Sequence, residues 1–353
     1  MRIASVLIAS LSLLSLIAPA IAQAGAPPTA PLPAGLTTRR PVATFSIVAR
    51  DGKTGQMGVA VQSHWFSVGT SVPWAQAGVG AVATQSLVDT RYGPMGLALM
   101  GGGRTAQQAL DALTSTDEGQ AYRQVAMVDA AGNIAAHTGD LCIANAGHVT
   151  GTLPDGTVFS CESNMMGPTG VPEGMAQAFR DATGSLADRL VAALVGAQAV
   201  GGDIRGMQSA AVLVVRAQST GKIWEDRLVD LRVEDHTNPV KEIGRVLRLH
   251  EAYEHMNAGD LAIEKDDMDT AIAEYGAAQR MAPHVAEMAF WTGVTLASAG
   301  KVDESIPHFR KAFADTTPRA DWVELLKRLP ASKLFPDDPA LIKRILREAN
   351  NRR

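Results

Sequence analysis

The chain has 353 residues, 46% of them hydrophobic, and this length accommodates two domains, or about three at most. That share of apolar side chains is enough for full cores and excludes a globally disordered protein. Its 32 basic and 36 acidic side chains give a net charge of −4, without a block of like charge. This balance argues against a nucleic-acid binder that works by counterion release and against a polybasic membrane-surface protein.

The N-terminus has the pattern of an export signal. Arg2 gives a positive start, residues 3–17 are almost wholly apolar, and the small residues in 20–24 offer cleavage sites. The apolar run is shorter than the about 20 residues that a membrane span needs, with an uncleaved anchor as the alternative. We therefore expect a signal peptide over 1–24 and a Pro/Ala-rich linker over 25–43. The mature protein is expected in the periplasm or secreted, without a membrane span.

Residues 44–237 predict a layered domain. Alternating and β-rich patterns predict strands at 44–49, 57–63, 79–85, 124–129, 134–137, 158–161, 210–216 and 224–233. Helical spacing predicts helices within 92–114, at 172–182 and at 185–200, with Thr105 and Ser185 as N-caps. The first two strands form a hairpin, and no βαβ crossover is present. The order predicts an α+β fold in which antiparallel sheets are covered by helices.

Residues 238–353 are helical and contain an internal repeat. At a spacing of 34 residues, Gly259 matches Gly293 and Tyr275 matches Phe309. The pattern resembles tetratricopeptide repeats, whose paired helices have small residues where they cross and an aromatic residue in the second helix. Because two repeats cannot bury their faces alone, we expect helices at 241–255 and 338–350 to cap them.

Two cysteines in an exported chain leave three interpretations open. Cys142 and Cys161 could form a disulfide that contributes about 3 kcal/mol, or both could be unpaired. The third interpretation is a metal site, since His137, Asp140 and His148 are close in sequence. The spacing of Cys142 and His148 matches no standard zinc pattern.

Several strings in 44–237 together resemble the domain-of-unknown-function family 1028. These are 44–52 (TFSIVARDG), 61–69 (VQSHWFSVG), 78–86 (GVGAVATQS), 137–139 (HTG), 146–148 (AGH), 164–165 (NM), 201–209 (GGDIRGMQS) and 230–236 (DLRVEDH). The family is grouped with the N-terminal nucleophile (Ntn) hydrolases, so the resemblance implies their four-layer αββα sandwich. It fixes the fold better than the substrate.

In an Ntn hydrolase the first residue of the mature chain is the nucleophile and its α-amine is the base, and the resemblance points to Thr44. An α-amine titrates near 7.7–8.0, close enough to neutrality to accept the proton. Because 43 residues precede Thr44, a second cut at Ala43–Thr44 is required after signal cleavage. The alternative is that Thr44 is an ordinary strand residue, favoured by its β-branching.

Other polar residues are expected around Thr44. Candidates for catalysis are Ser63 and His64, which end the second strand, Thr84, which ends the third, and Asn164, an oxyanion donor. Candidates for substrate binding are Gln85, Ser86, Asp203 and Arg205. The simpler interpretation of Asp203 and Arg205 is a structural ion pair, with a substrate carboxylate on Arg205 as the alternative. His137 and His148 are expected on turns, in structural roles.

The leading hypothesis is therefore an exported amidohydrolase that cleaves a small amide or a peptide. The second is a noncatalytic binding protein whose sandwich holds a ligand and whose repeats recruit a protein partner. We expect no nucleic acid partner and allow for a homo-oligomer. No cofactor is implied, because Gly101-Gly-Gly-Arg104 lacks the ending of a phosphate-binding loop and does not follow a strand.

Overall fold

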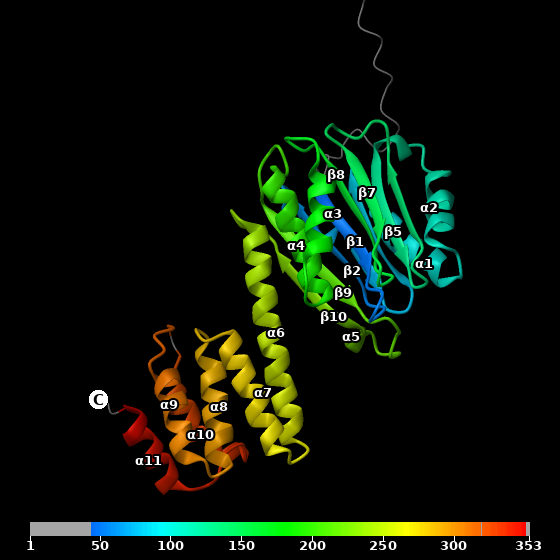
Figure 1. Cartoon of the computed structure of the whole chain (residues 1–353). Coiled ribbons are helices and arrows are strands. Elements are labelled where there is room, and N and C mark those ends of the chain that lie inside the picture. The colour runs from blue at the N-terminus through cyan, green and yellow to red at the C-terminus, as the bar shows by residue number, and fades with distance from the viewer. Residues whose placement is uncertain (1–43, 319, 351–353) are drawn as a thin grey trace, which may run out of the picture.

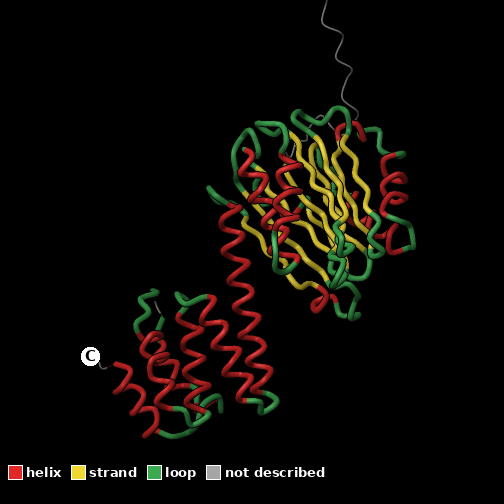
Figure 2. Tube along the Cα trace, viewed as in Figure 1, coloured by secondary structure: helices red, strands yellow, loops and turns green. Residues whose placement is uncertain are grey.

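The computed structural model describes residues 44–318 and 320–350. The expected signal peptide and linker (1–43) lie outside these residues. The described chain has two parts, a mixed α/β unit with two antiparallel sheets and a helical C-terminal unit, joined by one long helix (Figures 1 and 2).

The first sheet has six strands in the order β10-β9-β2-β1-β8-β7. Their bounds are β1 Thr44–Arg50, β2 Met57–Ser63, β7 Gly147–Thr152, β8 Val158–Asn164, β9 Ser209–Val215 and β10 Arg227–Val233. The second sheet has the order β3-β4-β5-β6. Its strands are β3 Pro73–Gln76, β4 Gly80–Ser86, β5 Arg123–Asp129 and β6 Ile134–Thr138. All ladder pairs are antiparallel, and the predicted hairpin of the first two strands is confirmed.

The two sheets face each other and helices cover their outer faces. One core lies between the sheets and includes Val48, Val59 and Ala126. A second core packs Phe45 and neighbouring residues of the first sheet against α3 Val171–Asp181 and α4 Leu186–Val200. A third packs the second sheet against α1 Tyr92–Gly101 and α2 Ala106–Thr114 (Figure 1). The strand alternation therefore sorts side chains between an inner layer and two helix-covered faces.

The predicted N-caps are confirmed. The Thr105 hydroxyl accepts the backbone N–H of Gln108, and the Gln108 side-chain oxygen accepts the backbone N–H of Thr105. Ser185 and Asp188 form the same reciprocal pair, called a capping box. Each box satisfies two backbone donors that a helix start leaves without partners.

Several elements differ from the sequence predictions. β3 and β7 were not predicted, because β3 has only four residues and β7 is a half-exposed edge strand without an apolar run. β8 continues to Asn164, and β10 begins at Arg227 because residues Ile223–Asp226 form a short helix, α5. His137 and His148 lie on β6 and β7, where turns were expected. Three-residue 3-10 helices occur at Val68–Thr70, Gln120–Tyr122 and Pro330–Ser332.

The connection between the units is one continuous helix, α6 Pro239–Ile263, where a separate capping helix at 241–255 was expected. Its first half contributes Val240, Ile243 and Leu247 to the core of the α/β unit. Its second half contributes Met256 and Ala262 to the core of the helical unit. One rigid element thus enters both cores, across the domain boundary expected at 237/238.

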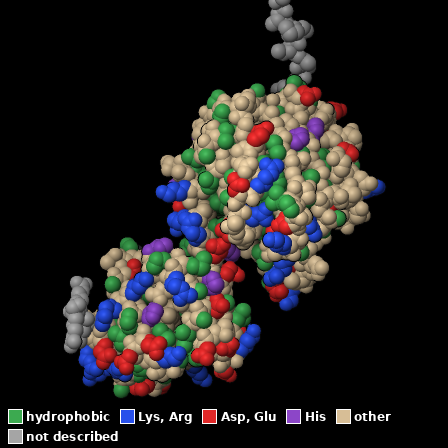
Figure 3. Space-filling model, viewed as in Figure 1, with side chains coloured by type: hydrophobic (Ala, Val, Ile, Leu, Met, Phe, Trp, Pro, Cys, Tyr) green, Lys and Arg blue, Asp and Glu red, His purple; other side chains and the backbone are tan. Residues whose placement is uncertain are grey.

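The helical unit continues with α7 Met268–Met281, α8 Ala286–Ser298, α9 Val302–Phe313, α10 Trp322–Arg328 and α11 Pro339–Asn350. The matched positions of the repeat make equivalent contacts: Gly259 packs on the ring of Tyr275, and Gly293 packs on the ring of Phe309. On the face shown in Figure 3, acidic and basic side chains are interspersed over this unit. No helix within the described residues is long and apolar enough for a membrane span.

The contact between Gly259 and Tyr275 gives a test of this packing. A Cβ at Gly259 would come within 2.8 Å of Cε1 of Tyr275, a buried ring that cannot swing away. We expect Gly259→Ala to lower the free energy of unfolding by about 1–3 kcal/mol. Chemical unfolding of the full chain, followed by circular dichroism, measures this change.

Gly276→Ala on α7 is the matched control, since its Cβ would meet only the end of the Arg280 side chain. Because alanine favours a helix over glycine, this variant should gain up to about 1 kcal/mol. Equal effects of the two substitutions would contradict the packing described here.

Candidate functional site

The layer between the sheets is polar at one end. Thr44 begins β1 in the middle of the six-stranded sheet, and its register partners are Ser63 on β2 and Asn164 on β8. All three side chains are fully buried, and the Thr44 hydroxyl donates to Ser63 Oγ at 3.3 Å. The side chains of three adjacent strands thus converge, as the sequence predicted for these three residues.

The facing sheet contributes two amides to the same place. Gln85 on β4 and Gln124 on β5 are register partners, and both are fully buried. Gln85 Nε2 donates to the carbonyl oxygen of Thr44 at 3.4 Å and to Gln124 Oε1 at 2.7 Å. Asn164 Nδ2 donates to the same Gln124 oxygen at 3.0 Å. These bonds join the two sheets directly beside Thr44.

Gln124 is the residue that the sequence analysis missed. Its Nε2 donates to Thr138 Oγ1 at 2.9 Å, to the carbonyl oxygen of Ser163 at 3.0 Å and to that of Gly147 at 3.1 Å. One amide therefore satisfies partners on four strands. The available signal was a glutamine at an inward position of a predicted strand, where Ala126 and Val128 follow on the same face.

The end of β2 is held by an ion pair. Asp203, with a fully buried side chain, pairs with Arg205 at 2.8 Å and accepts the backbone N–H of His64 at 3.2 Å. Asp203 and Arg205 therefore form an ion pair, which was the simpler of the two interpretations. Ser63 is anchored as well, because its carbonyl oxygen accepts from the N–H of Gln208 at 3.1 Å. The His64 side chain is exposed next to this anchor.

Thr84 and Ser86 are not brought to Thr44. Strand alternation turns Thr84 to the helix-covered face, where its hydroxyl donates to the carbonyl oxygen of Asp89 at 3.1 Å. Ser86 ends β4 with a left-handed φ of 70°, opposite Arg123 on the same outer side. The expectation that both join the site was wrong, because it placed three consecutive strand residues on one face.

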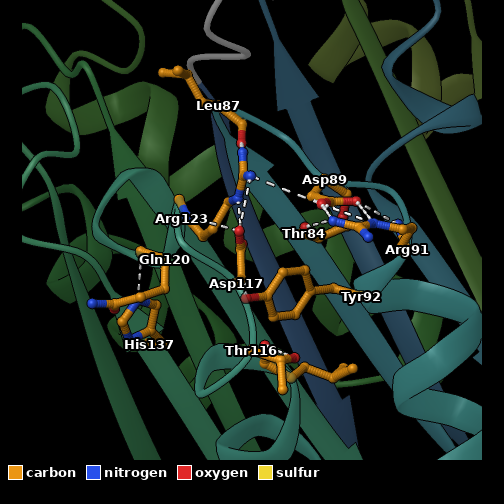
Figure 4. Close-up of polar contacts among 12 residues, drawn as sticks. Thr84, Leu87, Asp89, Arg91, Tyr92, Thr116, Asp117, Gln120, Arg123 and His137 are labelled. Atoms are coloured by element: carbon orange, nitrogen blue, oxygen red, sulfur yellow. Dashed lines mark hydrogen bonds and ion pairs between the residues drawn. The ribbon is translucent and has the colours of Figure 1, made fainter. Parts of the chain in front are cut away.

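Arg123 forms a buried cluster of charges behind the site (Figure 4). Its side chain is 6% exposed and donates to Asp117 at 2.8 Å and to the carbonyl oxygen of Leu87 at 2.5 Å. Asp89 lies 3.8 Å from Arg123 and is also bound by Arg91. Arg123 thereby holds the loop after β4 against the start of β5. Gln85 lies on β4 and Gln124 on β5.

Both carboxyls of this cluster are ionised at neutral pH. Burial raises the pKa of Asp89 and of Asp117, but hydrogen bonds and charges from Arg91 and Arg123 outweigh it, so each pKa lies below its usual value. The hydroxyl of Tyr92 donates to Asp117 at 3.1 Å. Burial and the adjacent carboxylate raise the pKa of Tyr92.

The cysteines are not bonded to each other, so the disulfide alternative was wrong and the unpaired alternative holds. Cys161 points from β8 into the helix-covered core with Phe45 and Ile47. Cys142 donates to the carbonyl oxygen of Arg123 at 3.3 Å, on the second sheet. The two thiols belong to different faces, which the sequence spacing did not reveal. Within 44–318 and 320–350, no group of three or more His, Cys, Asp or Glu is placed to hold a metal ion.

Comparison with known proteins identifies the family. The profile of the family of unknown function DUF1028 matches residues 44–243. A crystal structure of a DUF1028 protein from Silicibacter pomeroyi is similar at 31% sequence identity and a TM-score of 0.51, over 58% of this chain and 85% of that chain. No curated protein matched the chain. The chain belongs to the DUF1028 family.

The charge cluster predicts a specific loss of stability. Arg123→Met leaves Asp117 and Asp89 buried without their shared cation, and we expect it to cost about 3–5 kcal/mol in free energy of unfolding. The control Arg328→Met, whose side chain is 73% exposed and pairs with Glu324 outside the cluster, should cost less than about 1 kcal/mol. Urea unfolding at neutral pH measures both.

The same cluster predicts acid sensitivity. Because the pKa values of Asp89 and Asp117 are lower in the folded protein, their stabilisation is present above the unfolded value of about 3.9 and is lost as the pH falls through the folded values. The free energy of unfolding should therefore depend less steeply on pH in Arg123→Met than in the wild type across this range. An unchanged slope would contradict the assignment.

Proposed function

We propose that this protein is an exported amidohydrolase of the Ntn type that cleaves a small amide or peptide bond. In this proposal Thr44 is the nucleophile, and its α-amine, freed by cleavage of the Ala43–Thr44 bond, is the base. The observation that carries the proposal is the position of Thr44. It begins the central strand β1, its hydroxyl lies 3.3 Å from that of Ser63, Asn164 is its register partner, and Gln85 donates to its carbonyl oxygen.

The layering supports an Ntn-like sandwich for the α/β unit. Helices cover the outer face of each sheet, and the two sheets pack on each other, which gives the αββα order. The equivalent pairs Gly259–Tyr275 and Gly293–Phe309 support a tetratricopeptide-like arrangement of the helical unit. The surface of that unit would then recruit a protein partner.

The chemistry requires three elements. The threonine hydroxyl attacks the amide carbonyl carbon, and its proton passes to the α-amine, whose pKa near neutrality suits a general base. The carbonyl oxygen gains negative charge and needs hydrogen-bond donors. As the C–N bond breaks, the protonated α-amine gives its proton to the leaving amine, and water then hydrolyses the ester formed on Thr44. Asn164 is the candidate donor. Its amide nitrogen carries two N–H bonds, and the one that Gln124 accepts holds the side chain in place, whereas the two N–H bonds of Gln85 go to Thr44 and Gln124.

The uncut chain is a precursor in this proposal. As long as Thr44 is joined to Ala43, its nitrogen is an amide without basic character, and its side chain has no exposed surface. Cleavage therefore has to create the amine and open a path for the substrate.

A second candidate is a noncatalytic scaffold that binds a ligand and recruits a partner through the helical unit. The complete burial of Thr44 favours it, because a residue that stays buried supplies only hydrogen bonds to the polar layer.

Substitution of Thr44 separates the two candidates. Against a panel of chromogenic amides, we expect Thr44→Val to lower kcat/KM by about a thousandfold or more, because the attacking oxygen is lost. Thr44→Ser should retain measurable activity, since it preserves the hydroxyl and the amine.

The matched control is Thr150→Val, on an exposed position of β7, which should behave as the wild type. Equal activity of Thr44→Val and the wild type would overturn the nucleophile assignment and favour the scaffold.

A further inference from the structure

An acidic side chain lies inside the sandwich without a role in the proposed reaction. Glu162 on β8 is fully buried, and neither of its carboxyl oxygens has a hydrogen-bond partner among the described residues. It occupies the same face of β8 as Asn164, two residues further along the strand, so it belongs to the layer between the sheets. A buried polar group without a partner costs about 1–3 kcal/mol, and more if it is charged.

Two serine hydroxyls beside Glu162 are also buried without a hydrogen-bond partner among the described residues. Ser46 on β1 is the register partner of Glu162, and Ser160 is its neighbour on the same face of β8. Both hydroxyls are buried, and the described residues give neither a hydrogen-bond partner. Side chains of register partners have Cβ atoms about 4.5–5.5 Å apart, a separation that one small polar molecule bridges. Four orphaned oxygens thus share one patch of the layer.

The groups around Glu162 do not supply a counter-ion. Its register partner on β7 is His148, whose pKa is lowered by burial and by the nearby His137, so the imidazole is neutral at neutral pH. Cys161 is adjacent in sequence, and Cys142 is near enough for Glu162 to affect its pKa, but both thiols have raised pKa values and are neutral. Burial raises the pKa of Glu162 well above its usual value.

We propose that Ser46, Ser160 and Glu162 form an internal water-binding site, in which a carboxyl group and two hydroxyls hold one or two water molecules between the sheets. Water fits because it needs two to four polar partners, and these side chains supply four polar oxygens. The protonated carboxyl both donates and accepts, so it and the serines complete the hydrogen bonds of the water. The site adjoins Thr44 through β1 but does not depend on hydrolysis.

A crystal structure of the full-length protein at high resolution tests the water directly. We expect density for water within hydrogen-bond distance of Ser46 Oγ and of a Glu162 oxygen. If the space is dry, or if the Glu162 oxygens bind protein groups directly, the proposal is overturned. This experiment needs no variant, and no outcome of it bears on the role of Thr44.

Infrared spectroscopy and pH-dependent unfolding test the neutral acid. At neutral pH the wild type should have a carboxylic-acid carbonyl band that Glu162→Gln lacks. Because the folded pKa is raised, the stabilisation by protonated Glu162 is full below the unfolded value of about 4.3 and is lost as the pH rises toward the folded value. The urea midpoint of the wild type should therefore fall between about pH 5 and pH 9 more than that of Glu162→Gln.

Glu118→Gln, which removes an exposed carboxyl, is the control and should keep the wild-type pH dependence. An ionised Glu162 in the infrared spectrum, or equal pH dependence of Glu162→Gln and the wild type, would overturn the proposal.

Discussion

The burial of polar side chains between two sheets is the constraint on which this structure depends. A buried amide costs free energy unless its hydrogen bonds are made, with protein groups or with bound water. Gln124 supplies such bonds to its neighbours: it accepts from the amide nitrogens of Gln85 and Asn164 and donates to three oxygens on other strands. The strand ends around Thr44 are consequently fixed relative to each other, and a preorganised site requires such rigidity.

Support for this polar end comes from both sides of the sandwich. On one outer face Arg123 ties the loop after β4 to β5, and at the opposite sheet Asp203 anchors the backbone of His64. The helical unit is linked to the same body by α6, which enters the cores of both units. The outer face of the first sheet is covered by α3, α4 and the start of α6.

The sequence predicted the layered antiparallel fold, the N-caps at Thr105 and Ser185 and the convergence of Thr44, Ser63, Gln85 and Asn164. The fold and the N-caps could be predicted because strand alternation and capping are short-range properties. The grouping of the four polar residues was expected from the family resemblance. The sequence did not predict the edge strands β3 and β7, because their pairing is decided by the neighbouring strands rather than by their own residues. The sequence also did not reveal the polar positions of Gln124 and Glu162 or the separation of Cys142 from Cys161. These depend on which face of a sheet packs against which partner. Thr84 was misplaced for the same reason.

The central claim, that Thr44 becomes the N-terminus of a working site, is tested most directly by the intact mass and N-terminal sequence of the protein purified after export. The account predicts a chain that begins at Thr44, with a mass that matches residues 44–353. A stable, folded chain that begins upstream of Thr44 and hydrolyses amides as fast as a chain that begins at Thr44 would contradict it.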